Sequence, residues 1–260
     1  MRAGIFQCDG GGLSPHERLV QLEHAILGQQ LDLVVCPELF LSGYAVGDDV
    51  RQFAETQDGA FSNRVASLAR HQRTAIVYGY PEQQNELLFN SAICIDNKGH
   101  IVSNHRKMLL PPGFESEYFT SGDQLSTFNL GPVKCAMLVC YDVEYPEAVR
   151  AAAEAGAQII IVPTALDEQW GVVAHKLIPT RAFENGVWVL YANHAGVENN
   201  TRYLGNSCIV SPDGTDTIRA GTKQQLIIAE ICLEAVTQAQ NRLPYLKGVP
   251  QIRAIIHKER

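Results

Sequence analysis

An apolar run that ends in a thiol occupies residues 136–147, which read Ala136-Met137-Leu138-Val139-Cys140-Tyr141-Asp142-Val143-Glu144-Tyr145-Pro146-Glu147. Four consecutive apolar residues are long enough for a buried strand, and the polar, turn-forming residues after them end it. Cys140 therefore comes at the carboxyl end of the predicted strand, where open α/β sheets collect ligand-binding groups. This stretch predicts a sheet that presents a reactive side chain at its edge.

Composition alone does not distinguish Cys140 from a core residue. The chain has seven cysteines, and a free cysteine usually behaves as a small buried hydrophobe. The cysteines are odd in number, scattered and without a C-x-x-C pair, so neither a disulfide framework nor a zinc site is predicted. Unpaired cysteines favour a reducing compartment, and we expect the protein to be cytoplasmic.

Size and charge exclude several classes of protein. At 260 residues and 28.6 kDa the chain is near the upper limit for one hydrophobic core, so we expect a single domain over 1–260, with 243–260 as a C-terminal tail. The net charge of −7 and the lack of a dense Lys/Arg cluster argue against a nucleic-acid partner. No run reaches the ~18 apolar residues of a membrane span, and the first residues lack the apolar core of a signal peptide.

Strand patterns alternate with helical patterns along most of the chain. The first helix is predicted from a capping box, with Ser14 as N-cap, Pro15 at the first helical position and Glu17 three residues after the cap. The turn sequence Asp96-Asn97-Lys98-Gly99 predicts a β-hairpin that delivers Lys107 just past its second strand. The predicted strands are 2–7, 31–36, 74–80, 87–95, 100–105, 136–140, 158–162, 187–193, 206–210, 215–219 and 225–232, and the other predicted helices are 61–71, 145–155 and 175–185. Such alternation predicts a mixed α/β sheet protein.

Three predicted strands end near residues of complementary chemistry: Glu38, Lys107 and Cys140. A cysteine attacks as the thiolate, which requires a base and nearby positive charge, and Glu38 and Lys107 can supply them. When a thiolate adds to an amide carbonyl, the oxygen becomes anionic, and an ammonium together with the backbone N–H of Tyr141 would form an oxyanion hole. A cysteine–histidine pair is disfavoured because no plausible histidine lies near a strand end.

The segments around these residues closely resemble the signature segments of the nitrilase, or carbon-nitrogen hydrolase, superfamily. They are Pro37-Glu38-Leu39-Phe40-Leu41-Ser42-Gly43-Tyr44, Asn104-His105-Arg106-Lys107 and the stretch 140–147. The resemblance extends over nearly the whole chain and implies a four-layer α-β-β-α sandwich with a triad of Glu38, Lys107 and Cys140. Glu115 matches a second glutamate of the family, which lies near the thiol and helps to hold the substrate and the lysine. No metal or organic cofactor is implied.

Other residues receive roles by the same resemblance. Tyr141, Glu144 and Thr164 are candidates for substrate binding. Glu117 is expected to be solvated, and His105 to have a core or hairpin role. The residues expected in buried or helix-capping polar networks are Asp142, Glu147, Arg181 and Glu184.

The resemblance implies hydrolysis of a small primary amide to an acid and ammonia through a cysteine thioester. Ala174 stands where hydrolases of ω-amides often have an aromatic residue, which favours the aliphatic-amidase branch. Leu109 replaces a histidine that many relatives carry, so the surroundings of the lysine differ. Acidic residues on the segments that leave the site, Asp48, Asp49 and Glu144, favour a neutral or cationic amide over an anionic one.

Several alternatives remain open at this point. N-carbamoyl amines, ω-amides and nitriles are other substrates, because one triad serves all of these reactions. A catalytically silent binding module and a thiol redox sensor are hypotheses from other classes. The resemblance also implies a homodimer or higher homo-oligomer, paired through helices near the active-site cysteine and through the C-terminal tail.

Overall fold

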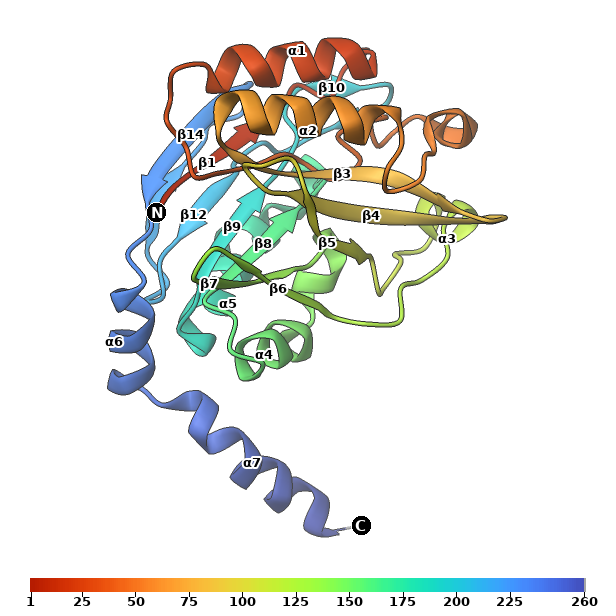
Figure 1. Cartoon of the computed structure of the whole chain (residues 1–260). Helices are drawn as coiled ribbons and strands as arrows, with labels where there is room; N and C mark the ends of the chain where they lie inside the picture. The colour runs from red at the N-terminus through yellow and green to blue at the C-terminus, as the bar shows by residue number, and fades with distance from the viewer. Residues whose placement is uncertain (260) are drawn as a thin grey trace.

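Two six-stranded β-sheets face each other in the computed structural model, which describes residues 1–259 (Figure 1). The strand order of the first sheet is β14 (Gln225–Glu230), β1 (Arg2–Gln7), β2 (Leu33–Val35), β3 (Ala75–Gln84), β4 (Leu87–Ile95) and β5 (Ile101–Arg106). The order of the second sheet is β13 (Asp216–Arg219), β12 (Cys208–Val210), β9 (Trp188–Ala192), β8 (Ile159–Pro163), β7 (Val133–Met137) and β6 (Ser126–Leu130). Each sheet has three parallel strands at its centre and antiparallel strands on both sides.

Helices cover the outer face of each sheet and complete the predicted four-layer α-β-β-α sandwich. α1 (Pro15–Ile26) and α2 (Ala60–Gln72) pack on the first sheet, and α4 (Pro146–Glu154) and α5 (Ile178–Asn185) pack on the second (Figure 1). Buried apolar side chains fill the space between the sheets and the space under each helix pair. The central strands are therefore covered on both faces, which explains why the sequence shows them as continuous apolar runs.

The sequence predicted the capped helix α1 correctly, but not the helices that are short or interrupted. The capping box of α1 is confirmed, since Ser14 Oγ accepts from Glu17 N at 3.3 Å and Glu17 Oε2 accepts from Ser14 N at 2.8 Å. The helix predicted over 175–185 is divided into a π-helical turn, Val173–Leu177, and α5. The short helix α3 (Phe114–Tyr118) lies in a stretch, 111–124, that was predicted to be a loop.

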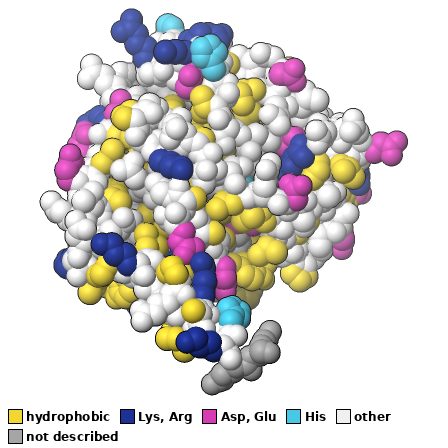
Figure 2. Space-filling model, turned by 60° about the horizontal axis from the view of Figure 1, so that its bottom comes forward, with side chains coloured by type: hydrophobic (Ala, Val, Ile, Leu, Met, Phe, Trp, Pro, Cys, Tyr) yellow, Lys and Arg dark blue, Asp and Glu magenta, His cyan; other side chains and the backbone are white. Residues whose placement is uncertain are grey.

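The C-terminal part of the chain forms α6 (Glu234–Arg242) and α7 (Tyr245–Ile256), and α7 extends beyond the sandwich in Figure 1. No residue of α7 is buried, and Ile252, Ile255 and Ile256 are more than half exposed. Figure 2 shows hydrophobic side chains exposed on this side of the molecule. The predicted tail is therefore largely helical, and its last residue, Arg260, lies outside the described residues. Within 1–259, no helix is both long and apolar enough to cross a membrane.

Candidate active site

Glu38, Lys107 and Cys140 each follow a strand, and they come from both sheets. Glu38 follows β2 and Lys107 follows β5 in the first sheet, whereas Cys140 follows β7 in the second. Backbone hydrogen bonds fix these positions: Glu38 N donates to Thr164 O at 3.3 Å, and Lys107 N donates to Asn90 O at 2.8 Å. The candidate site therefore lies where the ends of strands from the two sheets meet.

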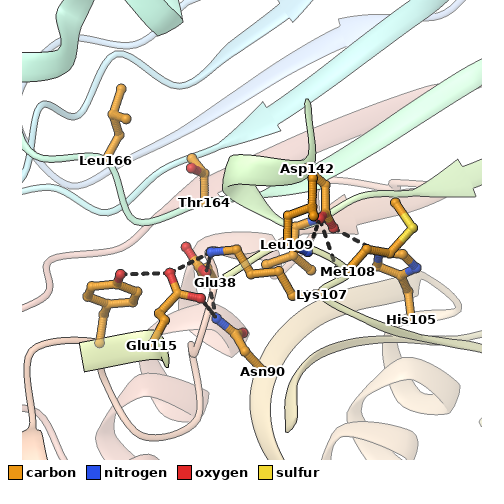
Figure 3. A network of polar contacts seen from close by, with 12 residues as sticks. Glu38, Asn90, His105, Lys107, Met108, Leu109, Glu115, Asp142, Thr164 and Leu166 are labelled. Carbon is orange, nitrogen blue, oxygen red and sulfur yellow. Dashed lines mark hydrogen bonds and ion pairs between the residues drawn. The ribbon is translucent and has the colours of Figure 1, made fainter. Parts of the chain in front are cut away.

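The Lys107 ammonium lies between two buried carboxylates (Figure 3). Its Nζ donates to Glu38 Oε1 at 2.8 Å and to Glu115 Oε1 at 2.5 Å. Asn90 Nδ2 bridges the same carboxylates, at 2.7 Å from Glu38 Oε1 and 3.0 Å from Glu115 Oε2. All four side chains are almost completely buried. Since a buried charge persists only when it is paired and hydrogen-bonded, the four groups form one connected ionic unit.

Burial and mutual charge set the protonation states of this unit. Burial raises the pKa of Glu38 to about 7, with Glu115 adding to the rise and Lys107 opposing it. Burial disfavours the charged form of Lys107, but the two carboxylates outweigh it and raise the lysine pKa above its usual value. The lysine therefore stays charged near neutral pH, where Glu38 can both accept and release a proton. Glu38 Oε2 is buried and has no hydrogen-bond partner among residues 1–259, so this oxygen is free to take the proton.

Cys140 begins the 3₁₀ turn Cys140–Glu144 with a backbone φ of 44°. A positive φ is uncommon for a non-glycine residue and persists where surrounding contacts hold it. The contacts here come from the Asp142 carboxylate, which accepts backbone N–H hydrogen bonds at 3.0–3.1 Å from Val139, Met108 and Leu109 (Figure 3). Asp142 thus joins the turn that carries Cys140 to the segment that carries Lys107.

Cys140 is partly accessible, whereas most of the other cysteines are buried. Burial raises the pKa of this thiol above its usual value and the charge of Glu38 adds to the rise, while Lys107 and a hydrogen bond with Thr164 oppose it. The thiol is therefore protonated in the resting protein near neutral pH. Because the thiolate is the nucleophile, attack requires a base, and Glu38 has a pKa suited to that role.

Of the three candidates for substrate binding, Thr164 and Tyr141 adjoin Cys140, and Glu144 lies near Lys107. Thr164 is buried beside Cys140, and its Oγ1 donates to Tyr191 OH at 3.3 Å. Tyr141 directly follows the nucleophile, and its N–H donates to no group in the described part of the chain. Glu144 is half-buried; burial raises its pKa, and the charges of Lys107 and Arg181 oppose that rise. Its carboxylate adds a partly accessible negative charge near the lysine.

Arg181 supports the turn, as predicted. Its Nε donates to Val143 O at 3.0 Å, its Nη2 donates to Glu144 O at 2.5 Å, and its Nη1 donates to Glu184 Oε1 at 3.1 Å. The prediction for Glu147 is wrong: this side chain is exposed in the first turn of α4 and makes no capping hydrogen bond. It contributes at most a favourable interaction with the helix dipole.

Four other sequence-based expectations can be compared with the structure. His105 is completely buried in β5 with Nε2 3.1 Å from Asp142 Oδ2, which agrees with the expected core or hairpin role, and Glu117 is exposed, as predicted. Asp48 and Asp49 are exposed, so they are solvated charges rather than parts of the buried unit. Ala174 is completely buried in the apolar layer under α4 and α5, so its small side chain reflects core packing and does not report on the acyl group.

Sequence reasoning missed several residues that build the site. Asn90 bridges the two carboxylates, and its signal was a polar residue within the mostly apolar strand β4. Tyr44 lies in a recognised segment, but its hydrogen bond to Glu115 was not anticipated. Gly79 of β3 is required because a Cβ there would overlap the backbone nitrogen of Leu39. His194 follows β9, contrary to the expectation of no histidine near a strand end, but its Nε2 donates to a backbone carbonyl, Glu38 O at 2.7 Å.

An α-β-β-α sandwich with a cysteine, a lysine and a glutamate after its strand ends, and a second glutamate on the short helix α3, is the arrangement expected of the carbon-nitrogen hydrolases. Residues 4–241 match the family model described as Carbon-nitrogen hydrolase. The chain therefore belongs to this family, within the nitrilase superfamily, and is an enzyme that hydrolyses C–N bonds.

Relatives of this chain include named hydrolases and solved amidases. It is 38% identical to the hydrolase in the pqqF 5′ region of Pseudomonas protegens, over 95% of this chain and 88% of the relative. It is 31% identical to an (R)-stereoselective amidase of Pseudomonas sp., over 83% and 78% of the two chains. A solved amidase from Nesterenkonia sp. AN1 in complex with butyramide is similar with a TM-score of 0.84 and 31% identity, over 94% of this chain and 95% of that chain. Another structure of that amidase carries the acetamide moiety of fluoroacetamide covalently at its active-site cysteine.

Proposed function

We propose that this enzyme hydrolyses a small aliphatic primary amide to a carboxylic acid and ammonia through a thioester on Cys140. The observation that carries the proposal is the buried Lys107, held by Glu38 and Glu115 and joined through Asp142 to the turn of the thiol. A nucleophile, a base and a fixed cation are then available in one place, which is what acyl transfer requires.

In the acylation step, Glu38 takes the proton of Cys140 while the sulfur attacks the amide carbon. The C–S bond forms and the carbonyl π electrons move to the oxygen. An ammonium has three donors, and Lys107 uses two of them for Glu38 and Glu115, so the third can stabilise the oxyanion together with the Tyr141 N–H. When the oxyanion collapses, the C–N bond breaks, and the proton on Glu38 passes to the nitrogen, which leaves as ammonia.

In the deacylation step, water attacks the thioester carbon and gives its proton to Glu38. The same donors hold the second oxyanion. Its collapse breaks the C–S bond, the proton on Glu38 returns to the sulfur of Cys140, and the carboxylic acid leaves. Glu38 thus acts as base and then acid in each half of the reaction, which suits a carboxyl group with a pKa of about 7.

The balance of charge favours an acyl group without a negative charge. The ammonium of Lys107 is paired with the carboxylates of Glu38 and Glu115, and a third carboxylate, that of Glu144, lies near it and is only partly offset by Arg181. An anionic acyl group would be repelled by this excess, and a cationic one attracted. The butyramide complex of the Nesterenkonia amidase supports a short aliphatic acyl group.

The proposal can be tested by measuring ammonia release from short aliphatic amides, N-carbamoyl amines, ω-amides and nitriles, with the Cys140→Ala protein as blank. We expect short neutral or cationic amides to have the highest kcat/KM. Preferred turnover of a nitrile, a carbamoyl amine or an anionic ω-amide would contradict the proposed substrate class. Release that is equal in the wild type and in the blank would contradict the mechanism.

We further propose a single-domain, cytoplasmic enzyme that pairs with a second copy through its C-terminal helix. The support is that α7 carries an exposed apolar set, Ile252, Ile255 and Ile256, and that all seven cysteines are free. Light scattering should give a dimer or a higher oligomer for the full chain and a smaller species for a chain that ends at Arg242. The same number of subunits in the two proteins would exclude α7 as the interface.

A further inference from the structure

A second buried ionic cluster lies outside the candidate site. Arg18 of α1 and Glu198 of β10 (Val197–Glu198) form an ion pair of 3.2 Å, and their side chains are only 1% and 5% exposed. A buried ion pair contributes little net stability, because removing two charges from water costs about as much as their attraction provides. The role of this pair is therefore to be found in the groups that it holds in place, rather than in its contribution to stability.

Glu198 holds the backbone of the segment 43–45. Its Oε2 accepts from Tyr44 N at 2.9 Å, from Ala45 N at 2.8 Å and from Tyr203 OH at 2.5 Å. Gly43 has a φ of 87°, and a Cβ there would overlap the Glu198 carboxylate. The carboxylate can therefore reach this segment only because a glycine precedes Tyr44.

The side chain of Tyr44 extends from this fixed backbone into the candidate site. Its hydroxyl donates to Glu115 Oε1 at 2.8 Å, the same oxygen that accepts from Lys107 Nζ at 2.5 Å. Its ring lies edge-on to Phe114, with a centroid distance of 5.4 Å. Direct contacts therefore run from Glu198 through Tyr44 to the carboxylate that orients the lysine.

The stretch 194–203, which contains Glu198, also holds the other end of this segment. His194 Nε2 donates to Glu38 O at 2.7 Å. The His194 ring packs against Tyr203 at a centroid distance of 5.0 Å, and the Tyr203 hydroxyl donates to Glu198. The segment 38–45, with the base at one end and Tyr44 at the other, is thus attached at both ends to residues 194–203.

We propose that Glu198, held by Arg18, is a positioning residue for hydrolysis, which fixes Tyr44 and through it the Glu115 carboxylate that orients Lys107. This inference rests on the proposed amide hydrolysis, because it assigns how the base and the cation of that reaction are kept in place. A misplacement of about 1 Å in a reacting group can lower a rate on the order of 10²-fold.

The variant Glu198→Gln tests the proposal, with Glu55→Gln as a matched control. Glu55 also accepts two backbone N–H hydrogen bonds, from Phe61 at 2.9 Å and Ser62 at 3.0 Å, but it does so at the start of α2. We expect Glu198→Gln to lower kcat on the order of 10²-fold and to shift the acidic limb of the pH profile of kcat/KM. Glu55→Gln should leave kcat and the limb unchanged. Equal behaviour of the two variants would overturn the proposal.

A double-mutant cycle with Tyr44→Phe identifies the route. If Glu198 acts through Tyr44, the loss in kcat from Glu198→Gln should be much smaller in the Tyr44→Phe background than in the wild type. Fully additive losses would show that the two residues act independently and would contradict the route. If Glu198→Gln does not fold, Tyr203→Phe replaces it in the cycle, because it removes a single hydrogen bond to Glu198.

The alkylation rate of Cys140 by iodoacetamide separates this inference from the proposed function. Peptide mass spectrometry gives the rate, with the exposed Cys232 as internal reference. A wild type without amide hydrolysis, together with an altered Cys140 rate in Glu198→Gln, would overturn the proposed function and support the positioning. A wild type that hydrolyses amides, together with a Glu198→Gln variant that matches Glu55→Gln in kcat, pH limb and alkylation, would overturn the positioning alone.

Discussion

The Lys107 cluster and the Arg18–Glu198 cluster are both buried and ionic, but they differ in how completely their groups are paired. In the second cluster one cation faces one carboxylate, and both oxygens of Glu198 accept hydrogen bonds. In the first, one cation faces two carboxylates, and two buried atoms, Glu38 Oε2 and Asn90 Oδ1, have no partner in the described chain. Unpaired buried polar atoms and excess charge destabilise a folded protein.

This difference separates a reactive cluster from a supporting one. Burial raises the pKa of Glu38 to about 7, and the charge of Glu115 adds to the rise, because Lys107 opposes these effects only in part. A fully paired glutamate such as Glu198 has no free oxygen to offer as a base. Where the protein leaves buried groups unsatisfied, proton transfer remains possible.

Removal of the nucleophile should have the largest effect. We expect Cys140→Ala to lower amide hydrolysis on the order of 10⁶-fold, because no other group in the reactive cluster can form the thioester. Ammonia release and mass spectrometry of trapped acyl-enzyme measure the loss. The control is Cys232→Ala, which changes an exposed cysteine and should keep full activity. An acyl group trapped on any other cysteine would show that Cys140 is not the nucleophile.

Removal of the cation from each cluster compares them directly. Both Lys107→Met and Arg18→Met leave buried carboxylates without a cation, so each should lower the free energy of unfolding by about 3–5 kcal/mol. Lys107→Met should in addition lose the oxyanion donor, which costs a further factor of about 10²–10³ in kcat relative to Arg18→Met. Urea denaturation and steady-state kinetics give the two quantities. Equal kcat in the two variants would remove Lys107 from the oxyanion site.

Much of the fold and part of the site could be predicted because their signals are local. A strand followed by a turn residue shows in the sequence, and this pattern located Glu38, Lys107 and Cys140. The partners of these residues depend on tertiary contacts. Arg18 and Glu198 are separated by 180 positions, and no local pattern relates them.

Short and exposed elements also escaped prediction. The five-residue helix α3 is too short to show a helical period, and its place is fixed by contacts of Glu115 with Lys107, Asn90 and Tyr44. The helix α7 has apolar residues but no buried face in the isolated chain, so the sequence suggested a tail. For α3, tertiary contacts rather than local preference therefore specify the element.

The pH dependence of kcat/KM should report the raised pKa of Glu38, the base of the reactive cluster. Glu38 must be deprotonated to act as base, and with a pKa of about 7 the rate should fall about tenfold per pH unit below that value. The charged or titratable groups that act on it are Lys107, Glu115 and Cys140. The lysine, whose pKa is raised, stays charged over this range. A profile that stays flat down to about pH 5 would show that Glu38 has the ordinary carboxyl pKa and is not tuned by the cluster.

The excess of negative charge in the reactive cluster should also affect substrate preference, but more weakly. Glu144 is partly accessible, so replacement by glutamine removes one charge with modest electrostatic effect, about 1 kcal/mol or about fivefold in relative kcat/KM. We expect Glu144→Gln to reduce the preference for γ-aminobutyramide over butyramide and to improve turnover of glutaramate. Glu147→Gln is the matched control, because this exposed carboxylate lies three residues further along the chain. If both variants keep the wild-type ratios of kcat/KM, Glu144 does not face the acyl group. The charges of Glu38 and Glu115 would then account for the substrate selectivity.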